Sequence, residues 1–179
     1  LLYWLIINNK KNWKIIGLVI GISVWIRPDA ITLLGPSLLA GFLMETSKRE
    51  RIKACLQISG FFLAGFIPYL IFNQLTCGSI WPNTFYAKQA EYQELTEAPI
   101  LKRAFQLFSL PMVGAGILLL PGTLYFGGMC WRKRNWAGLG MLIWWIGYTL
   151  IYAVRLPVTY QHGRYLIPAM PVYFLSGLS

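Results

Sequence analysis

The sequence predicts an all-α, polytopic membrane protein, and three observations lead to this fold class. Hydrophobic residues make up 56% of the 179 residues and charged residues only 12%, whereas a soluble domain has about 25% charged residues. Three uncharged runs each reach the roughly 20 residues that a helix needs to cross a bilayer. Basic residues gather in the segments between apolar runs. The uncharged runs are residues 54–75, 104–131 and 135–154.

Two shorter apolar stretches precede these runs. Residues 15–26 and 30–44 are separated by Arg27-Pro28-Asp29, and both outer flanks of the pair are basic. Because basic flanks favour the cytoplasmic side of a membrane, the two stretches should form a helical hairpin with the Arg-Pro-Asp turn at its outer tip. Residues 1–7 are interpreted as the end of an earlier span.

The rest of the chain should continue to alternate across the membrane. The expected order is an outward span at 54–75, an outer loop at about 76–103, an inward span at 104–130, an outward span at 135–154 and a returning segment at 166–179. Pro111 and Pro121 should kink the inward span. This gives about six to seven spans in a single transmembrane domain over residues 1–179. We expect that domain to be truncated at both ends, because the sequence begins and stops inside apolar runs.

The net charge of +10 at pH 7 follows the predicted topology. Ten of the 16 Lys and Arg residues lie in three segments predicted to be cytoplasmic, as the positive-inside rule requires. The charge is therefore a topology signal, and nucleic acid is not an expected partner. Cys55, Cys77 and Cys130 lie far apart without metal-ligand spacing, so neither a disulfide framework nor a metal site is predicted.

The outer loop carries helical signals of its own. Asn83 or Thr84 could cap a helix that runs to about Thr96, and three glutamates spaced by three residues would share one solvated face of it. Pro99 fits the first turn of a second helix. We therefore expect an amphipathic element on the membrane surface. The three glutamates are Glu91, Glu94 and Glu97.

Arg27, Pro28 and Asp29 form the first polar motif. In a structural interpretation, Pro28 disfavours helix at Arg27, Asp29 interacts with the positive N-terminus of the next helix, and Arg27 reaches toward lipid headgroups. In a functional interpretation, charged residues in a broken helical hairpin face a cavity. Arg27 would then bind a phosphate, and Asp29 would orient Arg27.

The second polar motif, Trp81-Pro82-Asn83-Thr84-Phe85-Tyr86-Ala87-Lys88, follows the outward span. Trp81 and Tyr86 could be interfacial aromatic residues, and Lys88 a surface charge. Alternatively, the proline turn delivers Tyr86 and Lys88 to a defined place, where Lys88 contributes a positive charge to a phosphate site.

The third polar motif, residues 162–168, reads His-Gly-Arg-Tyr-Leu-Ile-Pro and precedes the last apolar run. His162 is the single histidine of the chain; it could be a hydrogen-bonded structural group or part of a site. Arg164, at the mouth of a span, is the stronger candidate ligand for an anion. Gly163 permits the close approach of backbone or ligand.

These three motifs, in this order, resemble those of membrane glycosyltransferases of the GT-C type. They are similar to bacterial relatives of the protein mannosyltransferases and of the mycobacterial terminal arabinofuranosyltransferase, and the resemblance covers roughly residues 25–171. It implies a multi-pass enzyme of the bacterial cytoplasmic (inner) membrane that takes a sugar from a polyprenyl-phosphate donor. The sugar would pass to an acceptor hydroxyl of a glycan, lipid or protein on the extracytoplasmic face. Neither a cofactor nor a metal is expected.

The resemblance also implies residue roles. Arg27, Lys88 and Arg164 would neighbour the donor phosphate, and Asn83, Tyr86 and Tyr165 would shape the pocket. The acidic catalytic residue of the family lies on a first external loop that these 179 residues do not match, so this chain alone should be inactive. Asp29 is the best-placed carboxylate present, although the structural interpretation already accounts for it. The candidate substrate-binding residues are Arg27, Asp29, Asn83, Tyr86, Lys88, His162, Arg164 and Tyr165.

Two other functions remain open at this point. A flippase or transporter of lipid-linked sugars would also need basic groups facing a cavity, but transporters commonly pair broken helices in two repeated halves. The sequence shows a single Arg-Pro-Asp hairpin. A non-catalytic membrane subunit is the second alternative.

Overall fold

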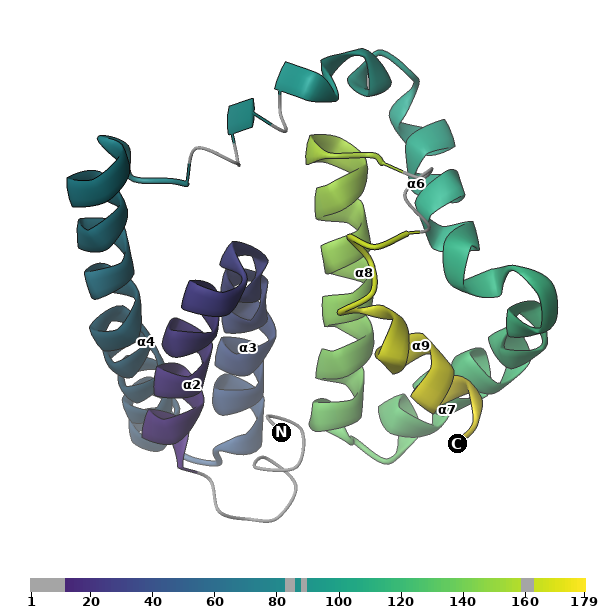
Figure 1. Cartoon of the computed structure of the whole chain (residues 1–179). Helices are drawn as coiled ribbons and strands as arrows, with labels where there is room; N and C mark the ends of the chain where they lie inside the picture. The colour runs from purple at the N-terminus through teal and green to yellow at the C-terminus, as the bar shows by residue number, and fades with distance from the viewer. Residues whose placement is uncertain (1–11, 83–85, 88–89, 159–162) are drawn as a thin grey trace. The chain divides into compact units, whose positions relative to one another are not determined.

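A computed structural model describes residues 12–82, 86–87, 90–158 and 163–179 (Figure 1). Within these residues all regular secondary structure is helical, as predicted. The chain divides into two compact units, one of Leu1–Pro82 with Trp136–Met141 and one of Asn83–Asn135 with Leu142–Ser179. Three helical segments of the described residues are long and apolar enough to cross a membrane: Lys48–Cys77, Gly114–Arg132 and Trp136–Arg155.

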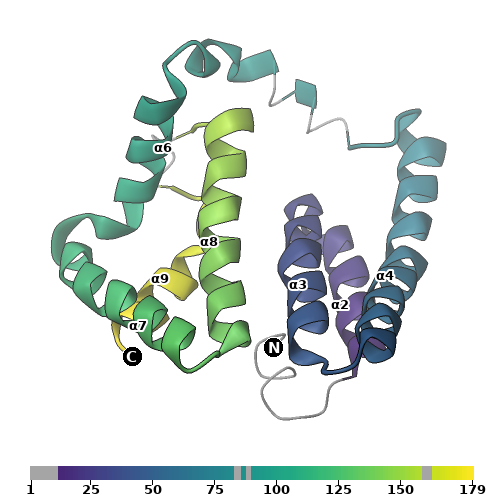
Figure 2. The ribbon, with the colours of Figure 1, turned by 180° about the vertical axis from the view of Figure 1, so that it is seen from behind.

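The first unit contains the predicted hairpin and the helix that follows it. Helix α2 (Trp13–Ile26), the 3₁₀ helix η1 (Pro28–Leu33), α3 (Leu34–Met44) and α4 (Lys48–Cys77) follow one another along the chain. Residue numbers rise in the same direction on both helices where α2 and α4 touch: Gly17 lies beside Ile58, and Gly21 lies beside Phe62. The two helices are therefore parallel, and α3 runs in the opposite direction, from the end of α2 back to the start of α4 (Figures 1 and 2).

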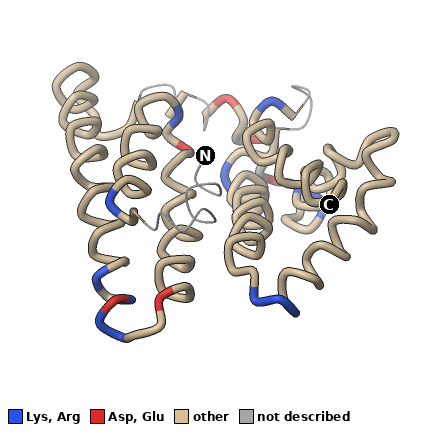
Figure 3. The backbone as a smooth tube through the Cα atoms, turned by 90° about the horizontal axis from the view of Figure 1, so that it is seen from below, with Lys and Arg blue, Asp and Glu red and all other residues tan. Residues whose placement is uncertain are grey.

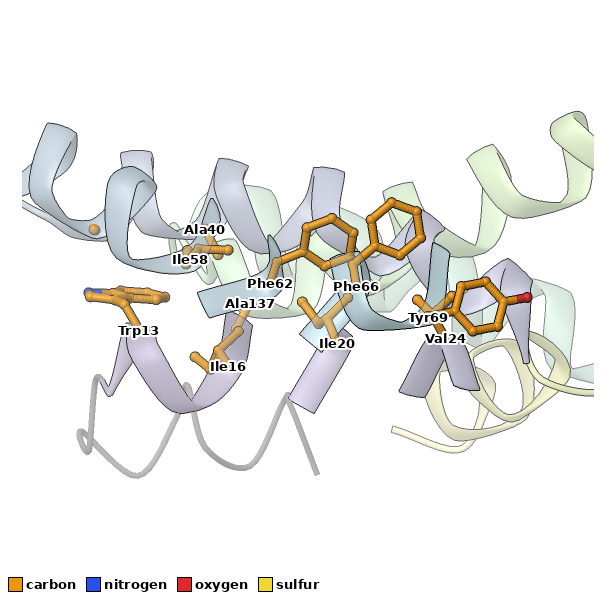
Figure 4. Packing of buried hydrophobic residues seen from close by; sticks show 11 residues of the cluster. Trp13, Ile16, Ile20, Val24, Ala40, Ile58, Phe62, Phe66, Tyr69 and Ala137 are labelled. Carbon is orange, nitrogen blue, oxygen red and sulfur yellow. The ribbon is translucent and has the colours of Figure 1, made fainter. Parts of the chain in front are cut away.

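Small residues allow α2 and α4 to approach closely. A Cβ atom placed on Gly65 would lie 2.9 Å from the carbonyl carbon of Gly21, so the two backbones touch at this point. Close approach through glycine is a common mode of helix packing in membranes. Around it, the rings of Phe62 and Phe66 stack with centroids 5.0 Å apart, and Ile20 lies beside them in the buried cluster (Figure 4).

Side-chain caps start both long helices of this unit. Asn12 Oδ1 accepts a hydrogen bond from the backbone amide of Ile15 at 3.3 Å. Ser47 Oγ accepts one from the amide of Glu50 at 3.2 Å, which is half of the capping box Ser-x-x-Glu. Helix α4 consequently begins at Lys48, six residues before the apolar run that we predicted as a span, because its cap lies within the charged segment.

The second unit differs from the predicted kinked span at 104–130. After the 3₁₀ helix η2 (Gln93–Thr96), helix α6 covers Ile100–Ser109 and ends at the 3₁₀ turn η3 (Leu110–Met112). A second 3₁₀ segment, η4 (Gly114–Leu119), then leads into α7 (Leu120–Arg132). The predicted span is thus broken into two helices and not only kinked, because Gly114 adopts φ +61°, a left-handed conformation that interrupts a helix.

The outer loop is helical in part, as predicted. Residues 86–87 and 90–91 are helical, and the proposed caps Asn83 and Thr84 lie outside the described residues. Glu91, Glu94 and Glu97 are exposed, as predicted for a solvated face. Helix α6 begins directly after Pro99 and buries Leu107 while Leu101 and Phe105 are exposed.

The second unit also contains α9 (Met170–Gly177) and the part of α8 (Trp136–Arg155) that follows Met141. Tyr173 of α9 donates a hydrogen bond from its hydroxyl to the carbonyl of Gly116 at 2.8 Å, and its ring lies 5.3 Å from that of Trp145 in α8. Thr123 Oγ1 of α7 also donates to the carbonyl of Tyr173, at 3.3 Å. Lys and Arg residues concentrate at helix ends and connections, while the middles of the helices are largely uncharged (Figure 3).

Candidate functional site

The Arg27–Asp29 motif forms a two-pronged ion pair at the break between α2 and η1. Arg27 Nε donates to Asp29 Oδ1 at 3.3 Å and Nη2 donates to Oδ2 at 3.0 Å. Pro28 occupies the first turn of η1. The Arg27 side chain keeps 43% of its surface exposed and Asp29 keeps 17%. The carboxylate therefore fixes the direction of a guanidinium that still reaches the surface.

After α4, the chain lies at the end of the first unit that also carries the α2–η1 break. Gly78 ends the helix with φ +67°, and Asn73 Nδ2 donates to the carbonyl of Ile80 at 3.4 Å. Trp81 then packs against the buried cluster, with its ring 6.3 Å from Phe66. Trp25 lies two residues before Arg27, and its ring centroid is 5.7 Å from that of Tyr69, which belongs to α4 as Phe66 does. The first polar motif and the start of the second therefore belong to one end of this bundle.

A tyrosine cluster lies in the second unit and includes the third motif. Tyr148 donates a hydrogen bond from its hydroxyl to the carbonyl of Tyr165 at 2.9 Å. The ring of Tyr152 lies 4.9 Å from Tyr148 and 6.0 Å from Tyr165. Tyr92 of the outer segment is buried against Tyr165 and Val158. The outer segment and the third motif thus meet through this cluster.

Arg164 lies over the outside of the cluster. Its guanidinium carbon is 5.1 Å from the centroid of the Tyr165 ring, a cation–π contact of about 0.5–1 kcal/mol at an exposed site. Gly163 has φ +66°, and a Cβ there would lie 3.0 Å from Met170 Cε. The turn at 163–166 closes through a hydrogen bond from the amide of Leu166 to the carbonyl of Gly163 at 2.7 Å. This turn buries Tyr165 and exposes Arg164.

Arg103 contributes a cation that the sequence did not single out. From α6, its Nη1 donates to the carbonyl oxygens of Ala153 at 2.9 Å and Val154 at 3.3 Å, at the end of α8. A guanidinium is well suited to the unpaired carbonyls of a helix C-terminus. Its Nε is buried without a hydrogen-bond partner in the described part of the chain.

The predicted site residues fall into two groups and a remainder. Arg27 and Asp29 lie in the first unit, and Tyr86, Arg164 and Tyr165 in the second. Tyr86 is exposed. Asn83, Lys88 and His162 lie outside the described residues. The expectation that Arg27, Lys88 and Arg164 open onto one cavity stays a prediction.

The tyrosine cluster contains residues that sequence reasoning missed. Tyr148 and Tyr152 are four residues apart in a predicted span, so they share one helix face, and this spacing was the available signal. No sequence signal marked Tyr92, because its partner Tyr165 is 73 positions away. Among the described residues, groups of three or more His, Cys, Asp or Glu side chains that could hold a metal ion are absent.

Comparison of the chain with protein-family models, curated proteins and solved structures finds no match.

Proposed function

We propose that the chain is part of an integral-membrane glycosyltransferase. It would move a sugar from a polyprenyl-phosphate donor to an acceptor hydroxyl on the extracytoplasmic face. The single observation that carries the proposal is the oriented Arg27 guanidinium, held by Asp29 at a helix break on the bundle end to which Trp81 returns. The motif order described above and the three long apolar helical segments support the membrane setting.

In this proposal the basic residues bind the phosphate that leaves the sugar. Arg27 would donate two hydrogen bonds to phosphate oxygens in the geometry that guanidinium groups favour. Lys88 and Arg164 would add positive charge, and Arg164 is exposed for such a contact. As the acceptor hydroxyl attacks the anomeric carbon, negative charge grows on the departing lipid phosphate. Preoriented cations stabilise that charge most at a water-poor interface.

Asp29 acts in this scheme as a positioning residue for Arg27. Both of its carboxylate oxygens accept hydrogen bonds from the guanidinium, so the carboxylate is already used to orient Arg27. A separate carboxylate would therefore take the proton from the acceptor, and we assign that role to no residue of this chain.

Sugar transfer from labelled polyprenyl-phosphate sugars, measured with the full-length protein in lipid vesicles, tests the proposal. Arg27→Ala should lower transfer on the order of 10- to 100-fold, because hydrogen bonds to charged groups contribute about 1.5–3 kcal/mol. Arg27→Lys should recover part of the loss, since it restores the charge without the fork. Asp29→Asn should raise the KM for the donor more than it lowers kcat.

Arg132→Ala serves as the matched control, because it removes the same side chain from the exposed end of α7 and should leave transfer unchanged. If the protein moves the lipid across the membrane without transferring the sugar, it is a flippase and the proposed enzyme activity is wrong. Equal activities of Arg27→Ala and the unmodified protein would overturn the assignment of Arg27.

A further inference from the structure

We propose that the start of α4 carries a binding site for an anionic phospholipid of the surrounding bilayer. The proposal rests on the membrane placement given above but not on sugar transfer. The feature behind it is a surface groove of about 550 Å³ along one face of α4. Its lining combines two basic residues, Arg49 and Lys53, with a glutamine and an apolar floor. The other lining residues are Ile52, Leu56, Gln57, Gly60, Phe61 and Ala64.

The charges gather at one end of the groove. Arg49 and Lys53 are one turn apart, so they share a helix face, and both are exposed. Lys14 of α2 lies over the apolar floor and not at this end, with Nζ 5.8 Å from the centroid of the Phe61 ring. The one acidic partner among the described residues is Glu50, 3.4 Å from Lys53 Nζ. The groove end therefore keeps a net positive charge, complementary to a phosphodiester headgroup.

The neighbouring Arg51 shows that position in the helix, and not charge alone, defines the site. Arg51 Nε donates to the carbonyl of Glu45 at 2.8 Å, and its guanidinium lies 5.2 Å from the Phe42 ring. Arg51 thus secures the connection between α3 and α4. Arg49 and Lys53 face the groove instead.

The floor of the groove suits an acyl chain. Leu56 is 67% exposed and Phe61 38% exposed, although both belong to a helix that is apolar enough to cross a membrane. Gly60 opens the floor, since a Cβ there would meet no atom within 4 Å. From Lys53 to Ala64 the helix rises about 16 Å, so a lipid with its phosphate at the basic end could lay the upper part of a chain along this floor.

Native mass spectrometry of the full chain in detergent, with equal amounts of phosphatidylglycerol and phosphatidylcholine, tests the site. The unmodified chain should retain one phosphatidylglycerol molecule in preference to phosphatidylcholine. Arg49→Gln with Lys53→Gln should weaken that retention by about fivefold for each charge removed, because a basic residue near anionic lipid contributes about 1 kcal/mol. The control pair Arg132→Gln with Lys133→Gln removes two exposed charges that do not line the groove and should change retention less than about twofold.

Gly60→Leu should also reduce retention, because its side chain fills the floor. Gly128→Leu is the matched control, since a Cβ on Gly128 likewise meets no atom within 4 Å. If both double charge variants lose the same amount of phosphatidylglycerol, the lipid is held only by the general positive charge of the chain, which overturns the site. Equal retention of phosphatidylglycerol and phosphatidylcholine by the unmodified chain would overturn it too. A second copy of the chain in the groove, seen as a dimer in place of the lipid adduct, would overturn it as well. Carbonate extraction of membranes checks the membrane placement independently.

Discussion

Single glycines set the distance between α2 and α4. A Cβ atom on Gly21 would lie 2.5 Å from the carbonyl oxygen of Phe62, and backbone cannot move aside as a flexible side chain can. Gly21→Ala should therefore force the helices apart and lower the free energy of unfolding by about 1–3 kcal/mol, as overpacking does. The midpoint of thermal unfolding in detergent measures this loss. Gly35→Ala adds the same methyl group where nothing lies within 4 Å, and it should not destabilise the protein. Equal midpoints for the two variants would contradict the contact.

At the scale of elements, α6 stabilises the end of α8 through Arg103. Its two hydrogen bonds to the carbonyls of Ala153 and Val154 join groups 50 positions apart in the chain. Arg103→Gln should free the last turn of α8 and speed amide hydrogen exchange at residues 153–158 roughly tenfold, given about 1.5–3 kcal/mol for hydrogen bonds to a charged group. Lys102→Gln, at the exposed neighbour, should leave exchange there unchanged. Unchanged exchange in both variants would show that Arg103 does not hold this end.

The elements also show how far sequence reasoning reaches. Helices α2, α4 and α8 follow from uninterrupted apolar runs, and the Ser47–Glu50 box would have moved the start of α4 to its observed place. The left-handed turn at Gly114 was not singled out, because the kink was assigned to Pro111 and Pro121, and a glycine in an apolar run is as often a packing residue as a kink. The Arg27–Asp29 pair was predictable because its members are neighbours. The Tyr92–Tyr165 contact was not, since it depends on tertiary packing.

For the whole molecule, the predicted topology places the end of α4 outside the cell. Cys77 is exposed at that end, Cys55 is half-buried and Cys130 is buried. A membrane-impermeant maleimide should therefore label Cys77 in intact cells, and Cys77→Ser should abolish the labelling. Labelling of Cys77 that appears only after permeabilisation would reverse the orientation. It would also remove the extracytoplasmic setting of the proposed reaction.

The unequal lengths of two parallel helices have a consequence for the bilayer itself. Helix α2 has 14 residues and α4 has 30, which correspond to about 21 Å and 45 Å, while the hydrocarbon layer is about 30 Å thick. In the predicted topology, lipids beside the shorter helix would compress to match it, at a cost of fractions of a kcal/mol per Å. Such local thinning would bring the headgroup plane down to Arg27. The arginine would then meet phosphates at their own depth, without extending out of the membrane to reach them.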